Sequence, residues 1–552
     1  MLQKEEAGVK KNLMRGSAYL CASLIFLGNT AGGVLETNRN VVDSFLGTKS
    51  YTVETGSSEG ELYSTFTADY TSTDELVSAH QEMGKRLSEE GSVLLKNEGV
   101  LPLKEQQRKV TLLGLRSNAK TLYGATVGVN VPAEQNVSLT TALTEKGLSV
   151  NPVMNEVYAT LASEDAFNKN VNKVSASFSG VLPGQEAAFV GAEPTAGDFA
   201  RINSGYQSSF AQYGDAAIVV VGRPGTEAGD YYPGSTGIAP DAARNALALT
   251  KDELALIELA KDNFETVIVL VNSANAMELG TLQNDTGVDA ILWIGFPGNY
   301  GMRGVAGILT GEVNPSGALP DIYASDSASS PAVANYGVMA WSNAGQYLDT
   351  AVDRGDYYLM EAEGIYTGYR YYETRYADVV MGQGNADSEV GTFDSEGAWN
   401  YAQEVTYPFG YGLSYSTFTY SAITATATGV DFVVTNDSDV AGSTVAQLYV
   451  RAPQGGVLHP DRELKGFVKV ELAAHESKSV HIDFDRYTFR HFDVAANAWK
   501  TESGEWTLLV GDNAERLKET LETALKRSDD RRQCRASAAF DSTHRCRRLH
   551  AR

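Results

Sequence analysis

Two carboxylates in one short segment are the residues of this chain best placed for acid–base chemistry. Glu227 and Asp230 follow the apolar run Ala216–Val221, and Gly225 and Gly229 lie within two residues of Glu227. If that run is a strand of a parallel sheet, the segment lies at the carboxyl end, where α/β sheets place ligand groups, and the glycines let the backbone turn close to a ligand. A glutamic acid that donates a proton at neutral pH needs a raised pKa, which burial supplies. From the residues alone, the plainer interpretation is a solvated carboxylate at Glu227 and a loop-bracing side chain at Asp230.

Other kinds of chemistry find little support in the sequence. It contains no phosphate-binding loop, no H-E-x-x-H pair and no G-x-S-x-G turn. The seven histidines include no pair at metal-ligand spacing, so we predict no metal site and no cofactor. The formal net charge of −24 argues against nucleic acid as a partner, because such a surface repels phosphate, and fits a neutral ligand such as a sugar better. The aromatic stretch Tyr366–Tyr376 offers rings for stacking on sugars, but we favour packing at a domain junction.

Short apolar runs separated by helical stretches indicate the element that positions Glu227. The runs are Val110–Leu115, Ala216–Val221, Thr266–Val271 and Val288–Ile294. Their apolar composition is typical of strands buried on both faces. One helix begins near Asp74, another is capped by Thr250 with Asp252 and Glu253 in its first turn, and a third lies around Ala274–Gln283. This alternation predicts a layered α/β domain with a mostly parallel sheet.

After about Tyr420 the pattern becomes that of an all-β sandwich. Strands are expected at Val430–Thr435, Val445–Arg451, Phe467–Leu472, Ser479–Phe484 and Trp506–Val510. From Arg527 onward the chain is rich in arginine and holds two of the three cysteines, which predicts a disordered or artefactual tail. The alternative of a basic tail for an acidic partner is less favoured.

The N-terminus carries a short apolar segment behind basic residues. Lys10, Lys11 and Arg15 precede Ala18–Leu27, which is apolar apart from Ser23. This arrangement is typical of a signal peptide or a weak membrane anchor, so we expect an extracellular or membrane-anchored protein. A buried helix is the alternative.

Five segments, in this order, resemble glycoside hydrolase family 3. They are Glu89–Asn97 with Leu101–Leu103, Asn314–Pro320, Gly364–Tyr372, Pro408–Tyr415 and Glu463–Phe467. The last is similar to the marker of that family's fibronectin-III-like domain, so the resemblance implies an α/β sandwich followed by a fibronectin-III-like sandwich. The segment Val221–Asp230 resembles the family's G-E-G-x-D loop, whose Glu protonates the leaving oxygen. This implies that Glu227 is the catalytic acid/base and that Asp230 binds substrate, although Thr226 and Ala228 replace glycines of the common pattern.

The family's nucleophile is an Asp on a TIM-like barrel, and the chain resembles permuted members in which the barrel comes last. Only 87 residues precede Ser88, against the ~250 typical of a barrel, and we expect no barrel after Asn513 either. The resemblance therefore implies β-glucoside hydrolysis by a retaining two-carboxylate mechanism, with this chain supplying only Glu227 and inactive alone. The alternatives are a non-catalytic surface protein that binds glycans or partners, and a generic α/β ligand-binding protein. Neither the sugar nor the oligomeric state follows from the sequence.

The sequence divides into six parts. These are an anchor or signal (1–35), a linker (36–75), the α/β sandwich (76–330), a junction segment (331–420), the fibronectin-III-like domain (421–515) and the tail (516–552).

Overall fold

The computed structural model describes ten stretches of the chain. They are residues 69–123, 136–168, 192–225, 246–335, 339–340, 357–358, 360–380, 400–453, 456–514 and 521–527. The chain divides into two compact units, Met1–Thr71 and Ser72–Arg552, and every element below belongs to the second. Within the described residues no helix is both long and apolar enough to cross a membrane. The apolar run Ala18–Leu27 lies outside those residues.

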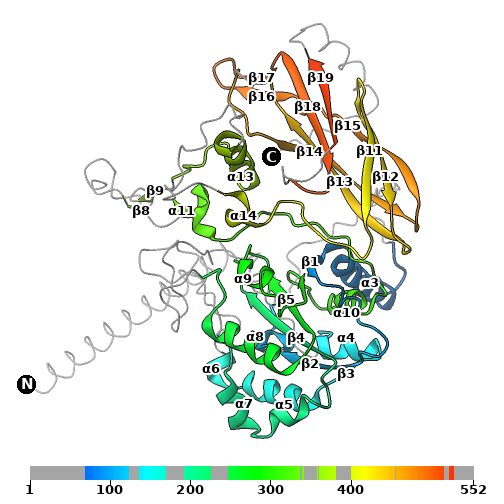
Figure 1. Cartoon of the computed structure of the whole chain (residues 1–552), viewed down its shortest axis with the longest axis vertical. Coiled ribbons are helices and arrows are strands. Elements are labelled where there is room, and N and C mark those ends of the chain that lie inside the picture. The colour runs from blue at the N-terminus through cyan, green and yellow to red at the C-terminus, as the bar shows by residue number, and fades with distance from the viewer. Residues whose placement is uncertain are drawn as a thin grey trace, which may run out of the picture. The chain divides into compact units, whose positions relative to one another are not determined.

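The first domain contains a six-stranded sheet in the order β1-β6-β5-β4-β2-β3 (Figure 1). The strands are β1 (Val93–Asn97), β2 (Lys109–Leu113), β3 (Ser149–Val150), β4 (Ala216–Arg223), β5 (Val267–Ser273) and β6 (Ala290–Trp293). Strands β2 to β6 are parallel, and only the edge strand β1 runs antiparallel to its neighbour. The predicted mostly parallel sheet is therefore confirmed.

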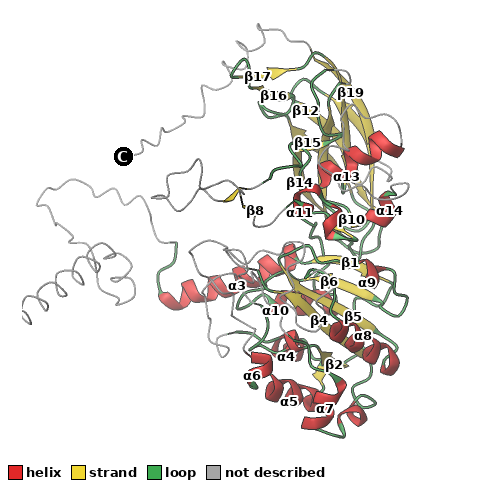
Figure 2. Ribbon diagram, turned by 90° about the vertical axis from the view of Figure 1, so that its left-hand side faces the viewer, coloured by secondary structure: helices red, strands yellow, loops and turns green. Residues whose placement is uncertain are grey.

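Helices cover both faces of this sheet (Figure 2). The helices are α3 (Thr73–Gly91), α4 (Leu139–Glu145), α5 (Pro152–Leu161), α6 (Asp165–Asn168), α7 (Ala196–Ile202), α8 (Lys251–Asn263), α9 (Gly280–Gln283) and α10 (Met302–Thr310). Side chains alternate along β4, so Val219 packs in one core with α5, α7 and α8, and Ile218 packs in the other with α4 and α10. Because both faces are covered, the strands are apolar throughout.

The helix predicted after Thr250 forms with its expected cap. Thr250 Oγ1 accepts from the Glu253 amide at 3.1 Å, and the Glu253 carboxylate accepts from the Thr250 amide at 2.8 Å. The helix expected around Ala274–Gln283 is wrong over its first half, since α9 contains only Gly280–Gln283. Ser273 Oγ instead accepts from the Asn275 amide, and Glu278 joins Leu247 through a backbone hydrogen bond of 3.0 Å.

The second domain is the expected all-β sandwich. Its strands are β11 (Phe418–Ala425), β12 (Gly429–Asn436), β13 (Gly442–Arg451), β14 (Glu463–Leu472), β15 (Ser477–Asp483), β16 (Arg490–Asp493), β17 (Ala498–Thr501), β18 (Gly504–Gly511) and β19 (Leu521–Arg527). Sheets β11-β12-β15 and β14-β13-β18-β19 enclose a core that includes Phe432, Leu448 and Trp506, and β16-β17 forms a separate hairpin. Residues 521–527, assigned to the tail from the sequence, pair with β18 instead.

Short elements link the two sandwiches. They are β7 (Tyr323–Ala324), α11 (Pro331–Ala334), β8 (Met339–Ala340), β9 (Tyr357–Tyr358), α13 (Tyr369–Arg375), a π-helix (Tyr376–Val380), α14 (Tyr401–Glu404) and β10 (Val405–Tyr407). Tyr369 on α13 stacks on Phe409 with ring centroids 4.5 Å apart, and its hydroxyl accepts from the Leu464 amide of β14 at 2.8 Å. The aromatic stretch thus packs at the junction, as favoured from the sequence.

Three of the segments that carry the family resemblance meet at this junction. Asn314 donates to Ser416 Oγ and to the Ala441 carbonyl, both at 2.9 Å, and accepts from Ser414 Oγ and the Tyr415 amide. The amide of Leu413 donates to the Leu94 carbonyl of β1 at 2.8 Å. These segments therefore connect the two domains rather than form a catalytic centre.

Candidate active site

The carboxyl ends of β2, β4, β5 and β6 share one edge of the sheet, because these strands are parallel. The segment that bears Glu227 and Asp230 leaves from the end of β4 at this edge. Both residues lie outside the described part of the chain, which stops at Gly225 and resumes at Ala246. The structure therefore describes the two anchor points of the segment.

Arg223, the last residue of β4, ties the end of this strand to the chain that returns at Ala246. Its side chain is fully buried, and its Nε donates to the Ala246 carbonyl at 2.7 Å. A second donor reaches the Ala248 carbonyl. The two terminal nitrogens grip the Glu253 carboxylate at 2.7 and 2.9 Å. The guanidinium of Arg223 thus joins the end of β4 to the returning chain and to α8. Its planar array of N–H donors suits this arrangement of acceptors.

The Arg223–Glu253 pair is charged on both sides. Burial by itself raises the pKa of Glu253, but the Arg223 charge and the hydrogen bonds from Arg223 and Thr250 outweigh it and lower the pKa. A buried carboxylate held ionised in this way is a structural clamp and not a proton donor.

Gly225 lies against the loops that follow β5 and β6. A Cβ on Gly225 would come within 3.4 Å of Asn275 Nδ2 and 3.5 Å of the Phe296 ring. Asn275 also donates to the Pro224 carbonyl at 3.0 Å. Gly225 does not have a positive φ, and a Cβ at these distances would make ordinary van der Waals contact, so neither the backbone angle nor the space requires a glycine here.

Polar and aromatic side chains join the neighbouring loops at the same edge. The Asn272 amide donates to the carbonyls of Tyr123 and Gly295 and accepts from the Tyr123 amide, all at 2.8 Å. The Arg116 guanidinium lies over the Tyr123 ring, 4.4 Å from its centroid, and Phe296 is the next ring at 6.4 Å. Aromatic faces beside fixed polar groups are the usual surroundings of a sugar.

A carboxyl group that the sequence did not single out lies at this edge as well. Glu193 is 7% exposed, and burial raises its pKa to about 8. Its two oxygens accept from the Leu115 amide, just beyond β2, at 2.9 and 3.1 Å. The carboxyl group is therefore mostly protonated at neutral pH, but both of its oxygens are already bound to a backbone amide. Nothing in its local sequence distinguishes it, because its pKa arises from contacts distant along the chain.

The structure also brings together two histidines and a glutamate that the sequence kept apart. The three residues are His459, His491 and Glu502, and they meet in the second domain. They are too far apart along the chain for a local motif to reveal them.

Comparison with known proteins identifies both domains. Residues 92–415 match the glycosyl hydrolase family 3 C-terminal domain, and residues 444–514 match the fibronectin type III-like domain. An exo-α-(1→6)-L-arabinopyranosidase of Bifidobacterium breve is 31% identical over 289 residues, covering 51% of this chain and 32% of that protein. A β-glucosidase of Ruminococcus albus is 26% identical over 447 residues, covering 79% of this chain and 40% of that protein. The chain thus spans well under half the length of these relatives.

Solved structures show the same two-domain fold. β-Glucosidase 3B of Thermotoga neapolitana, in complex with glucose, superposes with a TM-score of 0.58 at 26% identity, over 82% of this chain and 56% of that one. A β-glucosidase of Paenibacillus barengoltzii gives a TM-score of 0.61 at 24% identity, over 81% and 42%. With more than half of its residues matched by the family's own domain, this chain belongs to glycoside hydrolase family 3.

Proposed function

We propose that this chain is the acid/base-bearing part of a retaining β-glucosidase, with Glu227 as the proton donor. The observation that carries the proposal is the anchoring of its segment. The returning end at Ala246 is held by Arg223 at the carboxyl end of β4, and the leaving end at Gly225 lies beside Asn275 and the Phe296 ring. Family membership supplies the reaction class, and a glutamic acid on such a segment has the chemistry to protonate a leaving oxygen.

Glu193 is the other carboxylic acid to weigh at this edge. Its raised pKa is what a general acid needs, but both of its oxygens face the Leu115 amide in a buried position. A proton donor must reach the substrate, so we assign the chemistry to Glu227 and a bracing role to Glu193.

A retaining mechanism also needs a nucleophilic carboxylate about 5–5.5 Å from the acid. We propose that this Asp comes from a barrel domain that these 552 residues do not include, so that the chain alone turns over negligibly. An apolar stripe on α3 is consistent with covering by further polypeptide, since Leu76, Met83 and Leu87 are 50, 51 and 67% exposed along one face. Purified chain that hydrolyses an aryl β-glucoside at ordinary enzyme rates would refute this part of the proposal.

The role of Glu227 is tested in a chimera. Residues 92–514 replace the matching region of the Ruminococcus albus β-glucosidase, and hydrolysis is measured for glucosides with good and poor leaving groups. For Glu227→Gln we expect a loss of roughly 10²- to 10⁴-fold on poor leaving groups, and much less on an activated aryl glucoside, which needs little protonation.

Glu193→Gln is the matched control, because it makes the same change at the same edge of the sheet. We expect its rates to keep the parent's dependence on leaving group. A Glu227→Gln chimera with an unaltered dependence, or a Glu193→Gln chimera with the steep one, contradicts the assignment. Circular dichroism of each variant verifies folding.

A second candidate function, glycan binding without catalysis, rests on exposed aromatic residues of the β16-β17 hairpin. Trp499 is 48% exposed and Phe492 45% exposed, with ring centroids 5.6 Å apart, and Tyr487 lies 4.6 Å from Trp499. Exposed rings of this kind stack on sugars. Affinity electrophoresis in soluble β-glucan, with Trp499→Ala as the test and Phe467→Ala as an exposed aromatic control, decides whether the hairpin binds glycan.

A further inference from the structure

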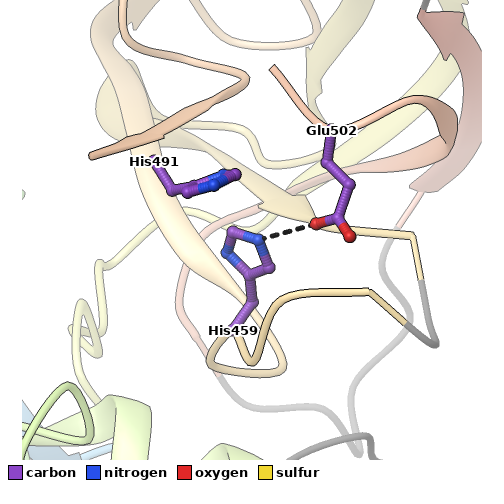
Figure 3. A group of neighbouring side chains, drawn as sticks. All are labelled: His459, His491 and Glu502. Atoms are coloured by element: carbon purple, nitrogen blue, oxygen red, sulfur yellow. Dashed lines mark hydrogen bonds and ion pairs between the residues drawn. The ribbon is translucent and has the colours of Figure 1, made fainter. Parts of the chain in front are cut away.

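Two imidazoles and one carboxylate converge in the second domain (Figure 3). His459 lies in the connection between β13 and β14, His491 lies on β16, and Glu502 directly follows β17. One ligand atom from each lies within 4.8 Å of the other two. Three segments separated along the chain therefore bring ligand-type atoms to one point.

His459 and Glu502 are already held in place. His459 Nε2 and Glu502 Oε2 are 3.0 Å apart, and the other carboxylate oxygen accepts from the Val457 amide at 2.9 Å. His459 is 7% exposed, and its ring meets Trp506 edge-on at 6.0 Å. A backbone donor on Glu502 and aromatic packing on His459 are the kind of support that orients metal ligands.

His491 is the least committed of the three. Its ring lies 5.6 Å from that of His459 at 77°, and its Nδ1 is buried with no hydrogen-bond partner among the described residues. A buried polar atom without a partner is uncommon in native proteins and calls for an explanation such as an ion.

We propose that His459, His491 and Glu502 bind a divalent transition-metal ion, zinc being the best match. Imidazole with carboxylate suits zinc, whereas calcium and magnesium prefer all-oxygen sets. Zinc bonds of about 2.0–2.1 Å place tetrahedral ligand atoms roughly 3.3 Å apart. The His459–Glu502 pair, at 3.0 Å, lies close to this spacing, and binding would bring the His491 nitrogen closer to it from within 4.8 Å. Water fills the fourth position.

The ion would join the β16-β17 hairpin to the connection between β13 and β14. The hairpin forms a two-stranded sheet of its own, separate from the two main sheets. Such a ligand set therefore fastens a peripheral element to the sandwich. This role is independent of the glycosidase chemistry at the other domain.

Isothermal titration of chelator-treated full chain with zinc chloride tests the site. We expect saturable binding of about one equivalent and a zinc-dependent rise in melting temperature. His491→Ala, a change at a partly buried residue, should weaken binding by at least the roughly 10- to 100-fold that even loss of a supporting residue causes. Glu502→Gln keeps the acceptor for Val457 but removes the anionic ligand, and should weaken zinc similarly.

His481→Ala is the matched control in the same domain. His481 is exposed and contacts Asp431 at 2.6 Å and Asp483 at 3.3 Å, outside the proposed site. Cobalt substitution checks the ligand type, because nitrogen and oxygen ligands give no thiolate charge-transfer band, and a variant with all three cysteines replaced by serine should bind as the parent does. The proposal is overturned if no equivalent binds, if His491→Ala or Glu502→Gln binds as tightly as the parent, or if binding is lost in the His481 or cysteine variant instead.

Discussion

Replacing Arg223 by alanine is expected to remove much of the stability of the α/β domain. The substitution leaves the buried Glu253 charge without the bidentate partner that holds it at 2.7 and 2.9 Å. Breaking a buried pair on one side costs about 3–5 kcal/mol. The carbonyls of Ala246 and Ala248 also lose their donor. Each carbonyl that stays buried without a new hydrogen bond costs about 1–3 kcal/mol of stability. Together these costs amount to about 5–11 kcal/mol if both carbonyls stay without a donor, so we expect a loss of at least about 5 kcal/mol, the lower end of the total stability of a typical domain.

The measurement is guanidinium denaturation followed by far-ultraviolet circular dichroism. Arg303→Ala is the control, since Arg303 binds the Glu145 carboxylate through two nitrogens in the same way, at 2.8 and 2.9 Å, but with the two side chains 32 and 40% exposed to solvent. Such surface pairs contribute about 0.2–1 kcal/mol. If the two variants lose similar amounts of stability, burial is not what makes the Arg223 pair matter, and the reasoning fails.

The pH dependence provides an independent check on the same pair. Burial raises the pKa of Glu253, but the Arg223 charge together with the hydrogen bonds from Arg223 and Thr250 outweighs burial, so the pKa is lowered in the folded state. The resulting stability is present above the pKa of the unfolded chain and is lost as the pH falls through the folded value. Arg223→Ala should remove this acid-sensitive part of the profile, while Arg303→Ala should leave it in place.

Two further predictions concern the buried carboxyl Glu193 and the domain junction at Asn314. Glu193 has its pKa raised to about 8 by burial, so its protonated form stabilises the fold below pH ~4.5 and this contribution is lost as the pH rises through 8. Glu193→Gln should therefore be more stable than the parent at pH 9 and equal to it near pH 4.5 in urea titrations; a constant difference would contradict this. Asn314→Ala removes four hydrogen bonds at the domain junction, and should lower stability by about 2–4 kcal/mol. Calorimetry should show a lower melting temperature, and an unchanged one would refute the role of Asn314.

The sequence predicted those elements whose signals are local. Thr250 and Glu253 form a capping box within four residues, and the cap appears as expected. Strands such as β4 and β5 are apolar throughout because both faces are covered, so their composition marks them. The helix at Ala274–Gln283 failed because the Glu278 backbone bonds to Leu247, a contact across the fold that residue preference does not register.

A site residue could be predicted only where a short sequence motif marks it. Glu227 was found through a resemblance, and its placement lies outside the described residues. The bracing carboxyl Glu193 and the pair His459–His491 gave no signal, because pKa and proximity depend on which distant segments pack together. Strands β16 and β17 have only four residues each and no run of apolar residues, so the sequence did not predict this hairpin.

The contact between Leu413 and β1 has a consequence for handling the α/β domain in isolation. Strand β1 is the antiparallel edge of its sheet, and the Leu413 amide donates to the Leu94 carbonyl along it. Unprotected sheet edges recruit other chains and promote aggregation. A clone that ends at residue 330 would uncover this edge and precipitate, whereas one that retains Pro408–Tyr415 supplies its own cover. The edge of this sheet is thus covered by residues that lie more than a hundred positions after its last strand, which ends at Trp293.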